Sequence, residues 1–464
     1  MEKTPIFSML EHYRKKERIS FAMPGHKGGR GLGQGAGLFS LDVTELADTD
    51  NLYTSTGAVE KARRLAAEFF GAEETYFLTN GTTGGIFTML AAVCRRGDRV
   101  LVNRGCHASV MNACSLLGLE PVFAEHPLIP GFSVLGGVTP AEIRRRLGPE
   151  IRAVLITSPS FYGACADVEA IAEITRQHGI PLLVDEAHGA HYSAEPALFP
   201  KPALRCGADL VVQSAHKTLN AVNQTSYLHV RSALVDHKRL RDCVQMLLTS
   251  SPSFVMAGFL DSARAELAGD NGWRAAWECC RRIKAEITQN TAVQVLGRDT
   301  DGVFDMDETR LVFNFAAYET TGFTVQKALR ERYNIDVEMA DLYNIICIAT
   351  AANTQAEIES LGRGIREIAK RLPQRETPLL HKAFPRVECV LSPQAAFDAP
   401  GEWIRPEAAA GRIAKSMVTV YPPGIPVLFP GAAVTREAVE YLAVYGAAGG
   451  EIIGLEQDQL YVVK

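Results

Sequence analysis

Short apolar runs alternate with helical patterns between residues 57 and 230, and this alternation limits the possible folds more than any other feature of the sequence. The runs are rich in β-branched residues and suit strands that are covered on both faces, as in a parallel sheet. Most of the segments between them carry apolar residues at helical spacing. Repeated strand–helix alternation predicts an α/β domain with right-handed crossovers. The predicted strands lie at residues 75–79, 99–102, 121–124, 153–157, 181–185 and 209–214.

The rest of the chain predicts one more strand, a helical region and a second, smaller domain. The additional strand covers residues 226–230, and the helical pattern of residues 232–290 breaks at residues 249–254. Shorter strands and helices follow, with surface loops expected over residues 373–406 and a late helix over residues 435–450. We therefore predict an N-terminal arm with a Gly-rich segment (1–56), a large α/β domain (57–290) and a C-terminal α+β domain (291–464).

Composition and charge exclude several classes of protein. The 464 residues include 47% hydrophobic and 22% charged residues and carry a net charge of −5, which does not suggest a nucleic-acid partner. No apolar run is long enough to span a bilayer, and the first 20 residues lack the apolar core of a signal peptide. Ten cysteines without a CxxC motif predict reduced, mostly buried thiols. We expect a cytoplasmic enzyme with no membrane partner and no metal site.

Two polar clusters directly follow predicted strands: VDEAHGAH at residues 184–191 and SAHKTL at residues 214–219. In open α/β sheets, ligands bind beyond the carboxyl ends of the strands, where Asp185 and Lys217 fall. This pair suits pyridoxal phosphate, because a lysine forms a Schiff base with the aldehyde and a carboxylate keeps the ring nitrogen protonated. The alternative is a helix-capping Asp185 and a surface Lys217, but the two clusters together favour the cofactor.

A phosphate group needs donors, and the segment TNGTTGG at residues 79–85 follows a strand and opens a helix. Backbone N–H groups and the helix dipole favour an anion at such a place. Taken alone, the segment fits an ordinary helix cap equally well. Together with the candidate Schiff-base lysine, it predicts a phosphate site made by Gly81, Thr82, Thr83, Ser214 and His216.

His107 and the glycine-rich segment 23–37 are two further features to place. His107 follows a predicted strand at a helix start, where its imidazole could stack on the pyridine ring or simply make a local hydrogen bond. The segment MPGHKGGRGLGQGAG lacks the G-x-x-x-x-G-K-[ST] spacing of a nucleotide P-loop, because Gly28 follows Lys27. It also precedes the first predicted strand, so Lys217 is the better candidate for the nucleophilic lysine.

Seven motifs occur in the order seen in the ornithine/lysine/arginine decarboxylases of fold type I, and the chain resembles that family over residues 5–440. The motifs are MPGHKGG, NGTTGG, NRGCHASV, VDEAHGAH, SAHKTL, LLTSSPSF and YPPGIPVLFPG. The closest similarity is to short forms without the N-terminal receiver-like wing domain. The resemblance implies the aspartate aminotransferase-like fold of pyridoxal-phosphate-dependent transferases, with a mostly parallel sheet in the large domain. It also implies a homodimer or higher homo-oligomer with active sites at the dimer interface.

The resemblance implies roles for four catalytic residues. Lys217 would be the Schiff-base lysine and Asp185 the partner of the ring nitrogen. His107 would stack on the ring, and His188 would lie near the phenolic oxygen and the reacting carboxylate. His26 and Lys27 would lie near the mouth of the active site. The residues that could reach a neighbouring subunit's cofactor are Thr249, Ser250 and Ser251.

The implied reaction is decarboxylation of arginine, lysine or ornithine to the corresponding amine and CO2, with Lys217 or His188 returning a proton to Cα. A distal cationic group needs a carboxylate partner. Ser416 and Ala432 stand where the family usually has carboxylates, and Asn220 stands where a proline is common. The acidic residues that could bind the distal cation instead are Asp42, Glu45, Asp48 and Asp50. The alternative is that these four residues belong to a solvated acidic loop.

Two other functions stay open on sequence grounds. An aminotransferase or aldolase-type lyase would use the same Lys–Asp pair, since the fold and cofactor do not fix the reaction. A transaminase commonly binds the substrate carboxylate through an arginine of the small domain, for which Arg412 is the nearest candidate. A catalytically silent paralogue that regulates an active decarboxylase is the other alternative, although the intact Lys217, Asp185 and His107 argue against it.

Overall fold

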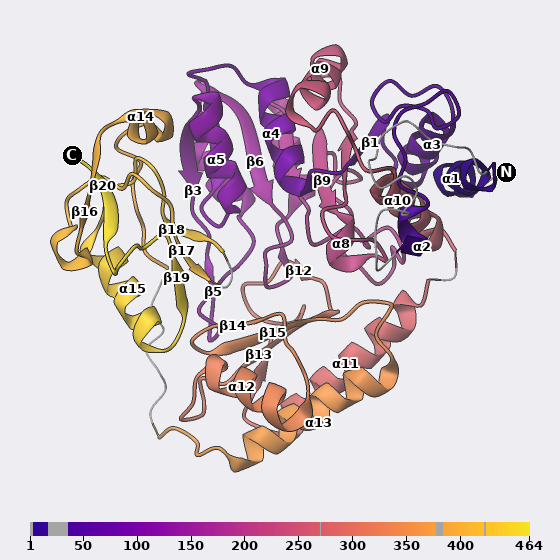
Figure 1. Ribbon diagram of the computed structural model, residues 1–464. Coiled ribbons are helices and arrows are strands. Elements are labelled where there is room, and N and C mark those ends of the chain that lie inside the picture. Colours follow the sequence, from indigo (N-terminus) through magenta and orange to yellow (C-terminus); the bar gives the residue numbers. More distant parts are fainter. Residues whose placement is uncertain (1–2, 17–35, 270, 377–383, 422–423) are drawn as a thin grey trace. The chain divides into compact units, whose positions relative to one another are not determined.

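The computed structural model describes residues 3–16, 36–269, 271–376, 384–421 and 424–464 (Figure 1). The chain divides into two compact units, each formed by segments that are distant in the sequence. Both units contain strands and helices, which confirms the predicted α/β class. The first unit comprises Met1–Val93, Pro181–Pro196 and Lys201–Asn271, and the second comprises Cys94–Ile180, Ala197–Pro200 and Gly272–Lys464.

Four strands of the first unit lie side by side in the order β1 (Glu74–Leu78), β10 (Ser226–Val230), β9 (Leu210–Ser214) and β8 (Leu182–Asp185). Strands β8 and β9 are parallel, whereas β10 runs antiparallel to both of its neighbours. All four match predicted strands to within one residue at each end. The direction of β10 is the feature that the apolar pattern did not indicate.

Helices cover both faces of these four strands. Phe70, at the end of α3, packs its ring on Tyr227 and His229 of β10. On the opposite face, Gly85 of α4 lies so close to β9 that a Cβ there would be 2.5 Å from Cγ2 of Val212. The helices of this unit are α1 (Pro5–Lys15), α2 (Ala36–Phe39), α3 (Ala58–Phe70), α4 (Gly81–Val93), α8 (Ala215–Thr218), α9 (His237–Leu247) and α10 (Phe254–Leu267).

The second unit begins with three parallel strands in the order β6 (Ile151–Thr157), β2 (Arg99–Asn103) and β3 (Glu120–Ala124). Their helices are α5 (Ala108–Leu117), α6 (Pro140–Arg146) and α7 (Val168–Gln177). All three helices were predicted from the spacing of their apolar residues. Short strand pairs accompany them, formed by β4 (Leu128–Ile129), β5 (Val134–Leu135), β7 (Ala164–Cys165) and β12 (Asp305–Met306).

A four-stranded sheet packs with three helices around its own apolar core further along the second unit. Its strand order is β11 (Gln294–Val295), β13 (Arg310–Asn314), β15 (Asn344–Ile348) and β14 (Met339–Ala340). The helices are α11 (Trp273–Asn290), α12 (Gly322–Tyr333) and α13 (Gln355–Arg371). These elements confirm the predicted α+β character of this part of the chain.

The C-terminal part contains two small sheets, β16 (Gly401–Ile404) with β20 (Leu460–Val463), and β18 (Pro426–Leu428), β17 (Val418–Tyr421) and β19 (Glu451–Ile453). Its helices are α14 (Pro393–Asp398), α15 (Arg436–Ala447) and the 3-10 helix Pro406–Ala408. Residues 384–391 form neither a helix nor a strand, as expected for the loops of this stretch, whereas α14 and β16 in the same stretch were not predicted. Strand β16 forms by pairing with the far end of the chain, and such pairing is invisible in a local pattern.

Other expectations have a mixed outcome. All ten cysteines are free and nine of them are buried, as predicted. Among the described residues, no helix is both long enough and apolar enough to cross a membrane. The domain boundaries predicted at residues 56/57 and 290/291 stay a prediction.

Asp50 organises the start of α3. Its carboxylate accepts hydrogen bonds from the backbone N–H groups of Thr56 (3.0 Å), Gly57 (2.9 Å) and Val59 (3.0 Å). The backbone of Asp50 lies in the left-handed region, with φ of 62°, which Asp tolerates better than most residues. A residue outside the helix thus satisfies N–H groups that have no partner within it.

Replacing Asp50 with alanine should lower the free energy of unfolding by about 1–2 kcal/mol, since the helix loses its capping carboxylate. The measurement is thermal or urea unfolding followed by circular dichroism. Asp48→Ala is the matched control, because Asp48 forms a surface ion pair with Lys16 (3.1 Å) of a kind that contributes about 0–1 kcal/mol. Equal stability of the two variants would contradict the assigned role of Asp50.

Candidate active site

Asp185, His188 and Lys217 follow the ends of the parallel strands β8 and β9. Asp185 is 3% exposed, and its Oδ1 accepts a hydrogen bond from the N–H of Ala187 (3.2 Å). Three residues later, the imidazole of His188 is 6% exposed and its Nε2 lies 3.1 Å from Nζ of Lys217. When Lys217 is an ammonium group it can only donate, so Nε2 of His188 accepts and the imidazole is neutral in that state. The structure thus brings an amine and a proton acceptor together, and the acceptor follows a buried carboxyl group by three residues.

Three hydroxyl groups meet at the N-terminus of α4. Ser214 and Ser226 are opposite each other on β9 and β10 and are fully buried. Thr82 is hydrogen-bonded through Oγ1 to the hydroxyl of Ser214 and lies 3.3 Å from that of Ser226. Gly81 enters the helix with φ of +69°, which suits glycine, while Thr83 is exposed. Hydroxyl groups at the start of a 13-residue helix form a polar cradle that fits a phosphate group.

His216 has one ring nitrogen already in use. Its Nδ1 donates to the carbonyl oxygen of Thr225 (2.9 Å). Burial lowers the pKa of His216, the bond to Thr225 acts to raise it, and the nearby charge of Lys217 acts to lower it. In the neutral ring, Nε2 is then an acceptor, so His216 could donate to a phosphate only in its protonated form.

His107 belongs to the second unit and caps α5. Its Nδ1 accepts a hydrogen bond from the N–H of Ser109 (3.2 Å) and lies 2.8 Å from the hydroxyl of the same residue. The ring is exposed. The local hydrogen bond considered as the alternative is therefore present, and the stacking role of His107 stays a prediction.

The other predicted polar residues of the first unit have varied surroundings. Asn220 is exposed and donates to Glu266 (2.8 Å), and the N–H of Thr249 donates to Oδ1 of Asn80 (3.4 Å). Among the acidic candidates, Asp50 caps α3 as described above and Asp48 pairs with Lys16. Glu45 accepts from the hydroxyl of Thr44 (3.1 Å), and Asp42 is half-buried. The residues proposed to reach a partner subunit, Thr249, Ser250 and Ser251, are exposed; His26 and Lys27 lie outside the described residues.

Two C-terminal positions where carboxylates were expected, Ser416 and Ala432, are enclosed by protein. Ala432 is fully buried, and the hydroxyl oxygen of Ser416 is also buried. Arg412, considered as a carboxylate-binding residue for a transaminase, donates to Oε1 of Glu402 (2.6 Å) and to the carbonyl oxygen of Val463 (2.8 Å). Its guanidinium group is therefore committed to a contact within the C-terminal part.

Arg104 is a buried residue that the sequence reasoning missed. It is 3% exposed and donates to the carbonyl oxygens of Pro426 (2.7 Å) and Val427 (2.9 Å). Its guanidinium group also lies over the ring of Phe384, 4.9 Å from the centroid, and burial lowers its pKa to about 10. The available signal was its place within the motif NRGCHASV, because its hydrogen-bond partners are more than 300 residues away in the sequence.

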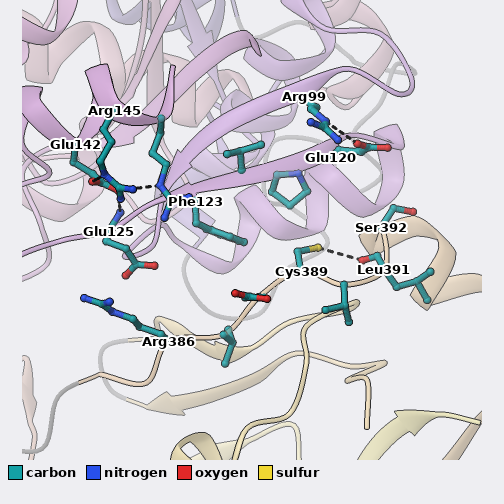
Figure 2. Close-up of a pocket in the computed structure, with 16 residues that line it drawn as sticks. Arg99, Glu120, Phe123, Glu125, Glu142, Arg145, Arg386, Cys389, Leu391 and Ser392 are labelled. Carbon is teal, nitrogen blue, oxygen red and sulfur yellow. Dashed lines mark hydrogen bonds and ion pairs between the residues drawn. The ribbon is translucent and has the colours of Figure 1, made fainter. Parts of the chain in front are cut away.

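A cavity of about 830 Å³ lies in the second unit (Figure 2). The residues that line it fall between positions 99 and 146 and between positions 386 and 392. None of these lining residues was predicted as a site residue. Figure 2 shows Arg99 directed toward Glu120 and Arg145 directed toward Glu142. The two ion pairs measure 3.1 Å and 2.7 Å between nitrogen and oxygen. Paired charges of this kind give no indication of a catalytic centre.

Comparison with known proteins places these observations in a family. Residues 4–306 match the family described as Orn/Lys/Arg decarboxylase, major domain, and residues 380–460 match its C-terminal domain. An arginine decarboxylase of Bacillus subtilis is 33% identical over 480 residues, covering 99% of this chain and 97% of that protein. A constitutive lysine decarboxylase of Escherichia coli is 23% identical over 98% of this chain and 79% of that protein.

The fold of this chain is also similar to the folds of solved structures. The lysine decarboxylase LdcF of Francisella novicida superposes with a TM-score of 0.83 at 18% identity, covering 99% of this chain and 81% of that structure. A serine palmitoyltransferase of Sphingomonas wittichii has a TM-score of 0.55 at 17% identity, over 70% of this chain and 80% of that structure. These matches confirm the predicted fold, and the family match confirms an enzyme that uses pyridoxal phosphate for decarboxylation. The chain therefore belongs to the Orn/Lys/Arg decarboxylase family.

Proposed function

We propose that the chain decarboxylates arginine to agmatine and CO2, with Lys217, Asp185, His188 and His107 as catalytic residues. The observation that carries this proposal is the 3.1 Å contact between Nζ of Lys217 and Nε2 of His188, next to the buried Asp185. Arginine is favoured over lysine and ornithine because the relatives matched over nearly their whole length in Bacillus subtilis and Bacillus anthracis are named arginine decarboxylase.

The first unit offers groups of the right chemistry for pyridoxal phosphate. A buried carboxyl group, an amine and a cradle of hydroxyl groups at a helix N-terminus match its ring nitrogen, aldehyde and phosphate. When bound, pyridoxal phosphate supplies the electron sink that decarboxylation at Cα requires. Lys217 would hold the aldehyde carbon, and Asp185 would keep the ring nitrogen protonated. The phosphate would be held by Gly81, Thr82, Thr83, Ser214 and His216.

Lys217 and His188 are placed to manage the proton that replaces the carboxylate. Nζ and Nε2 are within hydrogen-bond distance, so a proton can pass from the amine to the imidazole and be held there. His188 is almost fully buried, which limits exchange of that proton with bulk water. Either group could then return a proton to Cα of the substrate.

We also propose that the chain forms a homodimer or larger homo-oligomer and acts in the cytoplasm. The exposed segment Thr249–Ser251 would then approach the cofactor of a partner subunit. For the distal cation of the substrate, the acidic candidates are those that the sequence offers in the segment 42–50, of which Asp50 caps α3.

Release of CO2 should be fastest with arginine when purified protein is assayed with arginine, lysine, ornithine and several neutral and acidic amino acids. We expect kcat/KM for arginine to exceed that for lysine or ornithine by about 100-fold, because a site built for a planar guanidinium leaves polar groups unpaired around an amine. Preference for lysine or ornithine would overturn the substrate. No release from any amino acid would favour a transaminase or a silent paralogue.

Lys217→Ala should abolish the visible absorption of the lysine-bound cofactor, because the variant lacks the amine that would bind the aldehyde. Absorption spectra of the reconstituted protein are the measurement. Lys27→Ala is the matched control and should keep the band. A band that survives in Lys217→Ala would show that the cofactor lysine is a different residue.

Ser214→Ala should weaken binding of pyridoxal phosphate to the apoprotein by about tenfold, the cost of one hydrogen bond to a charged group. Binding of pyridoxal, which lacks the phosphate, should be unchanged, and fluorescence titration measures both constants. Ser262→Ala is a suitable control, since among the described residues that hydroxyl makes a weak 3.4 Å contact with Glu266. Equal loss for both ligands would argue against a phosphate contact at Ser214.

A further inference from the structure

A chain of four buried polar side chains crosses all four strands of the first unit. It consists of Thr75 on β1, His229 on β10, Gln213 on β9 and Glu186 directly after β8. Their exposed fractions are 1%, 1%, 3% and 2%. Buried polar groups need hydrogen-bond partners, so these residues depend on one another.

The chain lies on the face of the sheet opposite the phosphate cradle. Side chains alternate along a strand, so Ser214 and its predecessor Gln213 project from opposite faces of β9. Gln213 shares its face with His229, which packs against Phe70 of α3, whereas Ser214 shares its face with Ser226 and Thr82. The backbone hydrogen bonding between β8 and β9 continues one residue past the end of β8, because the N–H of Glu186 donates to the carbonyl oxygen of Val212 (2.9 Å).

The same alternation relates Asp185 to Glu186. Asp185 pairs with Val212 in the register of β8 and β9, and Val212 faces α4. Glu186 then turns to the other face, where its side chain meets that of Gln213. Two members of the buried chain are therefore the immediate neighbours of two candidate cofactor ligands, Asp185 and Ser214.

The hydrogen bonds between these four side chains all donate in the same direction, from Thr75 toward Glu186. Gln213 donates from Nε2 to Oε2 of Glu186 (2.7 Å), which leaves its Oε1 to accept from Nε2 of His229 (3.1 Å). Burial lowers the pKa of His229 to about 3, so its ring is neutral and Nδ1 accepts from the hydroxyl of Thr75 (2.9 Å). Glu186 ends the chain and also accepts from the N–H of Ala203 (2.8 Å) through its other oxygen.

Both carboxyl oxygens of Glu186 and both polar atoms of the Gln213 amide are thus held by named partners. Moving either side chain away would break these hydrogen bonds, so the bonds hold in place the backbone to which the side chains are attached. The bond between Glu186 and Gln213 joins the ends of β8 and β9 at the point where Asp185 and Ser214 leave the opposite face.

We propose that Glu186 and Gln213 are positioning residues that set the spacing between Asp185 and Ser214 from the reverse face of the sheet. The pyridine ring of pyridoxal phosphate is rigid and its phosphate is attached through a short CH2–O linker, so the cofactor spans only a narrow range of separations between these groups. The inference rests on the proposed roles of Asp185 and Ser214 and adds the residues that align them.

The test compares variants that break the hydrogen-bonded chain of side chains at its two ends. Glu186→Leu and Gln213→Met remove the bond beside the site while keeping side-chain volume. Thr75→Val removes the bond at the far end and serves as the matched structural control. Glu186→Gln is the conservative variant: its amide can still accept from Ala203 and can donate to a Gln213 amide that has turned round, with His229 in its other tautomer.

The measurements are the dissociation constant of pyridoxal phosphate for each apoprotein, the visible spectrum of each reconstituted protein, and thermal stability. We expect Glu186→Leu and Gln213→Met to weaken binding by about 10-fold or more and to alter the spectrum, as is typical when the support of a ligand-holding residue is lost. Thr75→Val should lower stability but leave binding and spectrum unchanged. Glu186→Gln should bind within about threefold of the wild type.

Equal cofactor affinity in Thr75→Val, Glu186→Leu and Gln213→Met would overturn the proposal, because the hydrogen-bonded side chains would then have only a structural role. If Glu186→Leu does not fold, Gln213→Met carries the same comparison. Failure of the wild-type protein to bind pyridoxal phosphate would instead refute the underlying function. The two failures are therefore distinguishable.

Discussion

The alternation of side chains across the pleat of β1, β10, β9 and β8 is the constraint on which the candidate site depends. Register places Ser214 opposite Ser226, and the next residue along β9 necessarily leaves by the other face. One face can therefore gather Asp185 and the hydroxyl groups, while the other is filled by α3 and a buried polar chain. A slip of one residue in any of these strands would exchange the two faces.

Glycine at the start of α4 makes this arrangement possible. A Cβ at Gly85 would meet both Val212 and Leu78, at 2.5 and 2.9 Å, so a larger residue would push the helix away from the strands. The N-terminus of the same helix carries Thr82 to the hydroxyl of Ser214. Close helix–sheet packing thus decides whether backbone N–H groups and hydroxyl groups can converge on one anion.

The apolar pattern predicted the strands well because each is short, buried and bounded by turn residues. Strands β6, β8 and β9 end at the predicted residues and begin within two residues of the predicted starts. The pattern could not show that β10 runs antiparallel, because strand direction depends on the connection and not on local hydrophobicity. It also could not show β16, whose partner β20 lies at the other end of the C-terminal part.

By itself, the sequence determined the order of the elements, the family motifs and the chemical types at the site, since these follow from local spacing and residue identity. Only the tertiary structure decided which polar groups meet. It joined Lys217 to His188, assigned Asp50 to a helix cap and tied Arg104 to Pro426. It also showed that Glu186, a second carboxyl group beside Asp185, faces away into a buried chain. These contacts link segments far apart in the sequence, and their formation depends on sheet register and helix packing.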